Sequence, residues 1–148
     1  MLKTQNFSNI ELGSYGEKLA QEFLKKQGYK IVVTNFSLRL GRNFSGHPIT
    51  GEIDIIAYDQ EILCFIEVKT RSTDFLPPEK QVNLAKQRQI NRVAKRYREI
   101  FHLRDHPIRF DVVAILLSES NSNIRLEKDF FQPISKDFYS WQRFSLRN

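Results

Sequence analysis

The chain has 148 residues, about the length of one domain, and its 41% hydrophobic and 27% charged residues are ordinary for a folded protein, which excludes disorder over most of its length. Lys and Arg number 23 against 17 Asp and Glu, so the net charge is +6 and the pI is near 9.5, which favours a polyanionic partner. Cys64, the only cysteine, excludes an internal disulfide, and no apolar run reaches the ~18 residues of a membrane span, so we expect a cytoplasmic protein without membrane contact.

The N-terminal half predicts one helix and a β-hairpin. A helix runs from Ser8 or Asn9 to about residue 27, since its apolar residues recur on one side at helical spacing. A β-branched strand follows over residues 29–34, and the glycines, proline and arginines of residues 37–50 predict a loop or bent edge. Two apolar runs, 52–58 and 61–68, predict a hairpin turning at residues 59–60, and their apolarity indicates a central pair of strands covered on both faces.

The C-terminal half predicts one long helix and two more strands. The helix begins at residues 77–79, where two prolines suit a first turn, and ends at about Phe101. A buried strand over 109–117, a polar turn over 118–123 and a strand over 124–131 follow. We therefore predict one α/β domain over residues 1–131. Residues 132–148 form an aromatic-rich extension that packs on the domain or on a partner subunit.

The predicted hairpin carries acidic residues in otherwise apolar runs. Glu67 and Lys69 project from the same face, because side chains alternate along a strand, and a short turn brings Asp54 across from Glu67, directly or diagonally. Two carboxylates there repel each other and lose hydration, and a cation between them would offset both unfavourable free energies. Mg²⁺, which takes one or two carboxylates plus water and phosphate oxygens, meets that need, and Lys69 would orient or deprotonate an attacking water. The alternative is that Glu67 and Lys69 form an ion pair on a solvated edge.

Lysine and arginine crowd the predicted long helix. Lys86 falls within the inward apolar stripe, so we expect it to reach the acidic pair or a bound phosphate, unless its stem simply extends to the surface. That stripe consists of Val82, Ile90, Val93, Tyr97 and Ile100. Like charges repel along a helix, and phosphate contacts would reverse that cost. The sequence thus predicts nucleic-acid contacts on this helix and near the hairpin, against the alternative of a solvated face. They are Lys86, Arg88, Arg92, Lys95 and Arg71, with Arg39 and Arg42 as extensions.

These residues carry a family resemblance. Asp54 followed by Phe65-Ile66-Glu67-Val68-Lys69 resembles the D…ExK core of the PD-(D/E)xK nuclease superfamily. A longer ordered set is similar to the YraN-like family of uncharacterised bacterial proteins, which is related to archaeal Holliday-junction resolvases. The set spans roughly residues 13–117 and comprises Gly13, Gly16-Glu17, Ala20, Gly28-Tyr29, Ile31, Asn35, Gly51 to Ala57, Phe65 to Arg71, Lys86-Gln87-Arg88 and Arg109 to Val113.

The resemblance implies a fold, a reaction and residue roles. The fold would be restriction-endonuclease-like, a central mixed β-sheet flanked by helices. Asp54 and Glu67 would hold Mg²⁺, or Mn²⁺ as a substitute, with the Val68 carbonyl, while Lys69 would be the catalytic lysine and Glu17 a helix-borne acid near the metal. The reaction would be endonucleolytic hydrolysis of phosphodiester bonds in nucleic acid, in DNA rather than RNA and in branched DNA in particular, by a homodimer. The 37–50 segment and the tail after residue 131 extend beyond the family pattern.

Two other functions fit the same residues. One keeps the fold without the chemistry, as a nucleic-acid-binding module whose carboxylates hold a structural metal. The other is an interaction scaffold that binds an acidic protein through its basic helix. A metal-dependent cleavage assay over DNA and RNA structures separates the enzyme from both.

Overall fold

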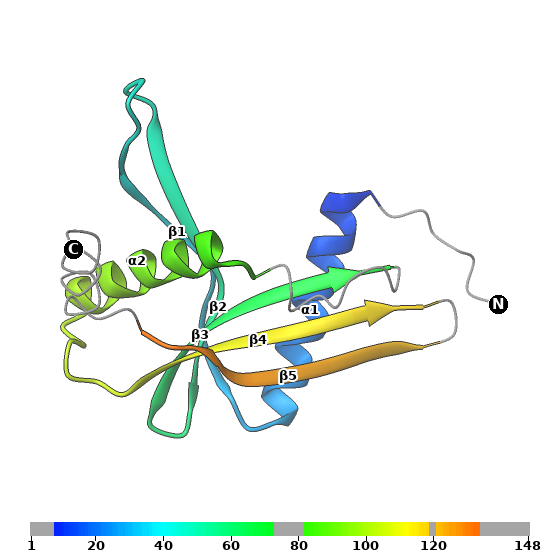
Figure 1. Ribbon diagram of the computed structural model, residues 1–148. Helices are drawn as coiled ribbons and strands as arrows, with labels where there is room; N and C mark the ends of the chain where they lie inside the picture. Colours follow the sequence, from blue (N-terminus) through cyan, green and yellow to red (C-terminus); the bar gives the residue numbers. More distant parts are fainter. Residues whose placement is uncertain (1–7, 73–81, 119–120, 134–148) are drawn as a thin grey trace, which may run out of the picture.

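One mixed sheet organises the molecule. The computed structural model describes residues 8–72, 82–118 and 121–133 (Figure 1). The described elements are α1 (Asn9–Lys26), β1 (Lys30–Arg42), β2 (Pro48–Asp59), β3 (Ile62–Arg71), α2 (Leu84–Ile100), β4 (Ile108–Leu117) and β5 (Ser122–Phe131). The strands lie in chain order, β1-β2-β3-β4-β5. β3 and β4 run parallel, because the connection containing α2 crosses over between them, and the other neighbouring pairs are antiparallel.

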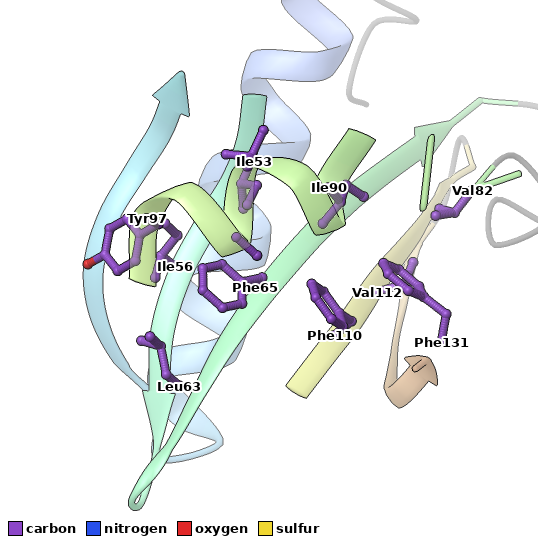
Figure 2. Close-up of a cluster of buried hydrophobic side chains, with 12 residues drawn as sticks. Ile53, Ile56, Leu63, Phe65, Val82, Ile90, Tyr97, Phe110, Val112 and Phe131 are labelled. Carbon is purple, nitrogen blue, oxygen red and sulfur yellow. The ribbon is translucent and has the colours of Figure 1, made fainter. Parts of the chain in front are cut away.

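The helices cover opposite faces of this sheet. On one face α2 contributes Ile90, Val93 and Tyr97 to a core with Phe65 and Phe110 (Figure 2). On the other face, α1 packs Ala20 and Leu24 against a second apolar cluster. This layered arrangement confirms the expected α/β fold with a central mixed sheet flanked by helices, as in restriction-endonuclease-like domains. It also confirms that the β2–β3 hairpin is central and covered on both faces.

Helix α1 starts where the sequence predicts. Ser8 accepts a hydrogen bond from the Glu11 backbone at 3.3 Å, and the Glu11 carboxylate accepts one from the Ser8 backbone at 2.8 Å. This reciprocal cap satisfies two amide groups that a helix start otherwise leaves without a partner. The predicted helix is therefore confirmed, and its cap fixes where α1 begins relative to the sheet.

Of the loop or bent edge expected over residues 37–50, the structure shows the bent edge, because β1 is an edge strand of the sheet and carries a β-bulge in this segment. β1 continues to Arg42 and pairs with β2 up to Arg42 opposite Pro48, so the connection shrinks to residues 43–47. Gly41 marks a β-bulge, where the register shifts, and not a loop. Leu38 and Leu40 pack against the α2-side core, and that tertiary contact holds the segment extended.

Three other boundaries differ from the sequence expectation. The β2–β3 turn is Gln60–Glu61, one residue later than predicted, because Asp59 still pairs with Ile62. α2 begins at Leu84, with Asn83 as its cap, instead of at residue 79; residues 77–79 lie outside the described part of the chain. Ile100, predicted to face inward, is about half exposed at the end of α2. β5 begins two residues earlier than expected, at Ser122.

The central hairpin opens into a fork. β2 pairs with β3 from Asp59 opposite Ile62 to Ile55 opposite Ile66, and the pairing stops there. Beyond Ile55, β2 remains paired with β1, and the two strands project together past α2 as an arm (Figure 1). We call residues 37–53 the β1–β2 arm. Asp54 is the first residue of β2 beyond the last β2–β3 pair.

A buried ionic network ties the strands together away from the fork. The Arg109 guanidinium donates to both oxygens of Asp111, which is fully buried, at 2.7 and 2.9 Å. It also donates to the Tyr29 hydroxyl and to Asp59, each at 2.8 Å. Burial, followed by the Asp111 charge, raises the pKa of Tyr29, so its hydroxyl stays protonated and donates to Asp111 at 3.1 Å. These bonds join the residue before β1 to β2 and β4.

Candidate metal and nucleic-acid site

The acidic pair lies at the fork. The last β2–β3 pair is Ile55 opposite Ile66, so extending the register by one residue sets Asp54 across from Glu67. The Asp54 carboxylate accepts a hydrogen bond from the Val68 backbone amide at 2.8 Å. A side chain thus replaces the backbone ladder at this point, and it fixes one carboxylate beside the other.

Glu67 is the most constrained group of the site. Its side chain is 4% exposed, and Oε1 lies 3.5 Å from Lys69 Nζ and 3.4 Å from Lys86 Nζ. Oε2 is buried and has no hydrogen-bond partner among the described residues. Burial and then the nearby Asp54 carboxylate raise the pKa of Glu67 to about 7, although both lysines act to lower it. The two ammonium groups therefore do not fully compensate the buried negative charge.

Lys86 reaches this site from α2. Its Nζ also donates to Gln89 Oε1 at 3.3 Å, and the Gln89 amide donates to the Thr50 carbonyl at 3.1 Å. Gln89 therefore connects the lysine to the β1–β2 arm. Gln89 is not among the site residues predicted from the sequence; its position one helical turn after Lys86, on the same side of the helix, is the signal that points to it.

Glu17 approaches the site from α1. The preceding residue, Gly16, packs so closely on β3 that a Cβ there would lie 1.8 Å from Thr70 Oγ1. The lack of a side chain at Gly16 thus lets α1 come close enough to set Glu17 near the fork. Burial and then the Asp54 charge raise the pKa of Glu17, while a hydrogen bond with Asn35 lowers it.

The fork brings two carboxylates together, not three. Within residues 8–72, 82–118 and 121–133, no group of three or more His, Cys, Asp or Glu side chains is placed to hold a metal ion. Glu17 therefore interacts with Asp54 through its charge, and Asp54 with Glu67 forms the candidate ligand pair. Two carboxylates plus water and phosphate oxygens are a donor set that suits Mg²⁺.

Some of the predicted nucleic-acid-binding residues lie on the exposed surface of α2, and others lie at or near the acidic pair. Arg88, Arg92 and Lys95 are exposed on α2, whereas Lys86 lies at the acidic pair. Arg71, at the end of β3, is half-buried, and its Nε has no partner among the described residues.

The basic residues of α2 also line two grooves. A groove of about 490 Å³ is bordered by Arg88, Arg92, Lys95, Arg98 and Arg104, with Glu99 the one acid in its lining. A groove of about 210 Å³ lies between α2 and the arm and is lined by Arg39, Leu40, Arg92, Lys95, Arg96 and Glu99.

Comparison with known sequences identifies the family. The sequence model described as uncharacterised protein family UPF0102 matches residues 16–115. The chain belongs to this family. The YraN-like resemblance seen in the ordered motif is thereby confirmed. The UPF0102 match includes the fork, Glu17, Lys69, Lys86 and the basic helix.

Individual UPF0102 relatives are similar over most of their length. The protein CPE1705 of Clostridium perfringens strain 13 is 42% identical over 127 residues, which cover 84% of this chain and 96% of that protein. A UPF0102 protein of Caldicellulosiruptor bescii is 43% identical, over 82% of this chain and 97% of that one. Among solved structures, the crystal structure of SSO0001 overlaps with a TM-score of 0.41 and 17% identity, over 96% of this chain and 62% of that chain.

Within the described residues of this UPF0102 protein, neither helix is both long and apolar enough to cross a bilayer.

The raised pKa of Glu67 makes stability depend on pH. Its folded-state pKa of about 7 exceeds the ordinary value of 4.5, so the folded protein binds more protons than the unfolded chain between these values. In metal-free buffer the free energy of unfolding should therefore fall as pH rises from about 4.5 to about 7, by on the order of 3 kcal/mol. Glu67→Gln cannot ionise, so its free energy of unfolding should fall less over this pH range. Urea unfolding of the wild type and the variant at several pH values measures the difference. If the free energies of both proteins change with pH in the same way, the raised pKa does not belong to Glu67.

Proposed function

We propose that this UPF0102 protein is a Mg²⁺-dependent endonuclease that hydrolyses phosphodiester bonds in nucleic acid at the fork between β2 and β3. The observation that carries the proposal is Glu67. Its carboxylate is buried, borders Asp54, and keeps one oxygen without a partner among the described residues, although two lysines already contact the other oxygen. A divalent cation held by Asp54 and Glu67 would supply the positive charge that this buried carboxylate lacks.

Each residue around the fork would have a separate role in metal binding or catalysis. Asp54 and Glu67 would hold the metal, with the Val68 carbonyl, and the metal when bound would activate water and neutralise phosphate charge. The Val68 amide already fixes the Asp54 carboxylate at 2.8 Å, so one ligand is oriented in advance. Lys69 Nζ, beside Glu67, would orient the attacking water and take part in its proton transfer. Glu17, near Asp54, would tune the charge of the site from α1.

Lys86 and the basic helix would hold the substrate. Lys86 enters the site from α2, and cation binding at Glu67 would free its ammonium group to contact the phosphate being cut. Arg88, Arg92 and Lys95 would contact phosphates farther along the strand, and Arg71 would do so from the end of β3. The family resemblance favours DNA, branched DNA in particular, and a homodimer. Those finer assignments rest on that resemblance.

Metal binding tests the centre directly. Mg²⁺ or Mn²⁺ should raise the melting temperature of the wild type by mass action, with stabilisation of about 2.7 kcal/mol at a metal concentration 100 times Kd. Asp54→Asn should abolish the response, because it replaces a negatively charged ligand at the fork with a neutral amide oxygen, which binds a divalent cation more weakly. Glu61→Gln is the matched control: it neutralises an exposed carboxylate at the far end of the same hairpin and should respond as the wild type does. Calorimetric titration and thermal unfolding measure the effect, and an equal response in Asp54→Asn would remove the site as assigned.

A further inference from the structure

The β1–β2 arm is braced at its base. The Arg92 guanidinium donates to the Leu40 carbonyl at 2.9 Å, and Gln89 donates to the Thr50 carbonyl at 3.1 Å. Gly51 lies so close to α2 that a Cβ there would approach a Val93 methyl to 2.4 Å. These contacts fix both strands of the arm on the basic helix. Residues 41–48 extend beyond them and are all exposed (Figure 1).

The tip of the arm is ordered by its own hydrogen bonds. The Gly46 amide donates to the Asn43 carbonyl, which closes a four-residue turn, and Asn43 Oδ1 accepts from the His47 amide at 2.9 Å. Arg42 adds a bond from its guanidinium to the Gly46 carbonyl at 2.7 Å. Phe44 occupies the second position of this turn. Its backbone is therefore fixed before any partner binds, which lowers the ordering cost of a contact made by its ring.

Phe44 points its ring into solvent. Among the described large apolar side chains it is the most exposed, and its ring is fully exposed. Most of the charges on this part of the protein are basic. Arg39 and Arg42 lie on the arm, where Glu52 is the one acid. Arg92, Lys95 and Arg96 line the groove between the arm and α2, where Glu99 is the only acid of the lining. An apolar protein partner gains nothing from this charge, whereas a phosphate chain does.

We propose that Phe44 is a stacking residue for nucleic acid, which binds an unpaired base while the groove between the arm and α2 holds the adjoining phosphates. Leu40 and Phe44 are separated by at most about 13 Å of extended chain, so one strand can contact groove and ring together. An aromatic face binds any base it can reach. In an uninterrupted duplex both faces of every base are stacked, so the ring selects single strands, gaps and branch points. This inference rests on the proposed nucleic-acid function and adds a substrate class to it.

Binding in the absence of divalent metal tests the proposal. Wild type, Phe44→Ala and Phe44→Trp are titrated, with EDTA present, against a labelled single strand and a labelled four-way junction that has unpaired bases at its centre. A relaxed circular duplex, which has no ends, serves as competitor. Phe44→Ala should bind the strand and the junction at least about 5-fold more weakly, near the low end of the contribution of one stacked base. Phe44→Trp should retain the affinity, and competition by the circle should be the same for all three proteins.

Two controls separate stacking from other causes. Ile10→Ala, which truncates another exposed apolar side chain on α1, should leave every affinity unchanged. Phe44→Ala should also keep the wild-type slope of log affinity against log salt, because the ring neutralises no phosphate, whereas Arg39→Ala should flatten it.

Four results would overturn the proposal. Two concern binding by Phe44→Ala: an unchanged affinity, or an equal loss on the circular duplex. The third is a wild-type dimer that becomes a monomer in Phe44→Ala, measured by sedimentation, which would mean that the ring joins two copies of the chain. The fourth is a wild type that binds no nucleic acid. The metal centre is judged separately, by the metal response of Asp54→Asn.

Discussion

Lys69→Ala is expected to slow cleavage about 10²–10⁴-fold at saturating substrate, while the variant still folds and binds nucleic acid nearly as well as the wild type. Lys69 Nζ lies 3.5 Å from Glu67 Oε1, beside the proposed metal. One ammonium group among the many bases of the chain adds little to total phosphate affinity. A group placed at the attacking water acts instead on the transition state, so its loss appears in the rate.

Lys95→Ala provides the matched control for Lys69→Ala. It removes the same charge from an exposed position on α2 and should lower affinity slightly, while cleavage at saturation stays at the wild-type rate. Single-turnover cleavage with Mg²⁺ and Mn²⁺, on single strands, duplexes and branched substrates, measures both variants. If Lys69 only pairs with Glu67, Lys69→Ala loses stability and its cleavage per folded molecule stays intact. A wild type that binds but cuts nothing favours the non-catalytic module.

Arg109→Ala should have the largest effect on stability, lowering the free energy of unfolding by about 3–5 kcal/mol. The guanidinium contacts Asp111 twice and also Asp59 and Tyr29, and Asp111 is fully buried. The variant leaves that carboxylate with the Tyr29 hydroxyl and the Asp129 amide, but without an opposite charge. An uncompensated buried charge is costly, because the interior solvates it poorly.

Lys128→Ala tests whether the stability lost in Arg109→Ala comes from the buried charge of Asp111 or from the loss of any ion pair in the network. Lys128 contacts Asp59 at 3.1 Å in the same network, but its side chain is 52% exposed. An exposed pair contributes about 0–1 kcal/mol, so this variant should unfold at nearly the wild-type urea concentration. Comparable losses in the two variants would show that the buried charge of Asp111 is not the cause. Both proteins should retain their metal response, since the network lies away from the fork.

The sequence by itself determined the type and order of most elements, and the pair of acids. Alternation along β3 set Glu67 and Lys69 on one face, and the short β2–β3 turn brought Asp54 across from Glu67. The capped start of α1 and the apolar run of β4 were equally local signals. These predictions succeed because each depends on residues within one element or one hairpin, where periodicity and turn length fix the geometry.

The tertiary structure decided the fork, the arm and the neighbours of the acids. The sequence of residues 37–50 left a loop or a bent edge open, and packing of Leu38, Leu40 and Gly51 on the α2 side holds the segment as strands. The contacts of Gln89 with Thr50 and of Gly16 with Thr70 join residues far apart in the chain. Such contacts leave no period in the sequence, because they depend on how whole elements pack. Packing therefore determines that Lys86 reaches Glu67 and that Phe44 stands exposed at the tip of a fixed arm.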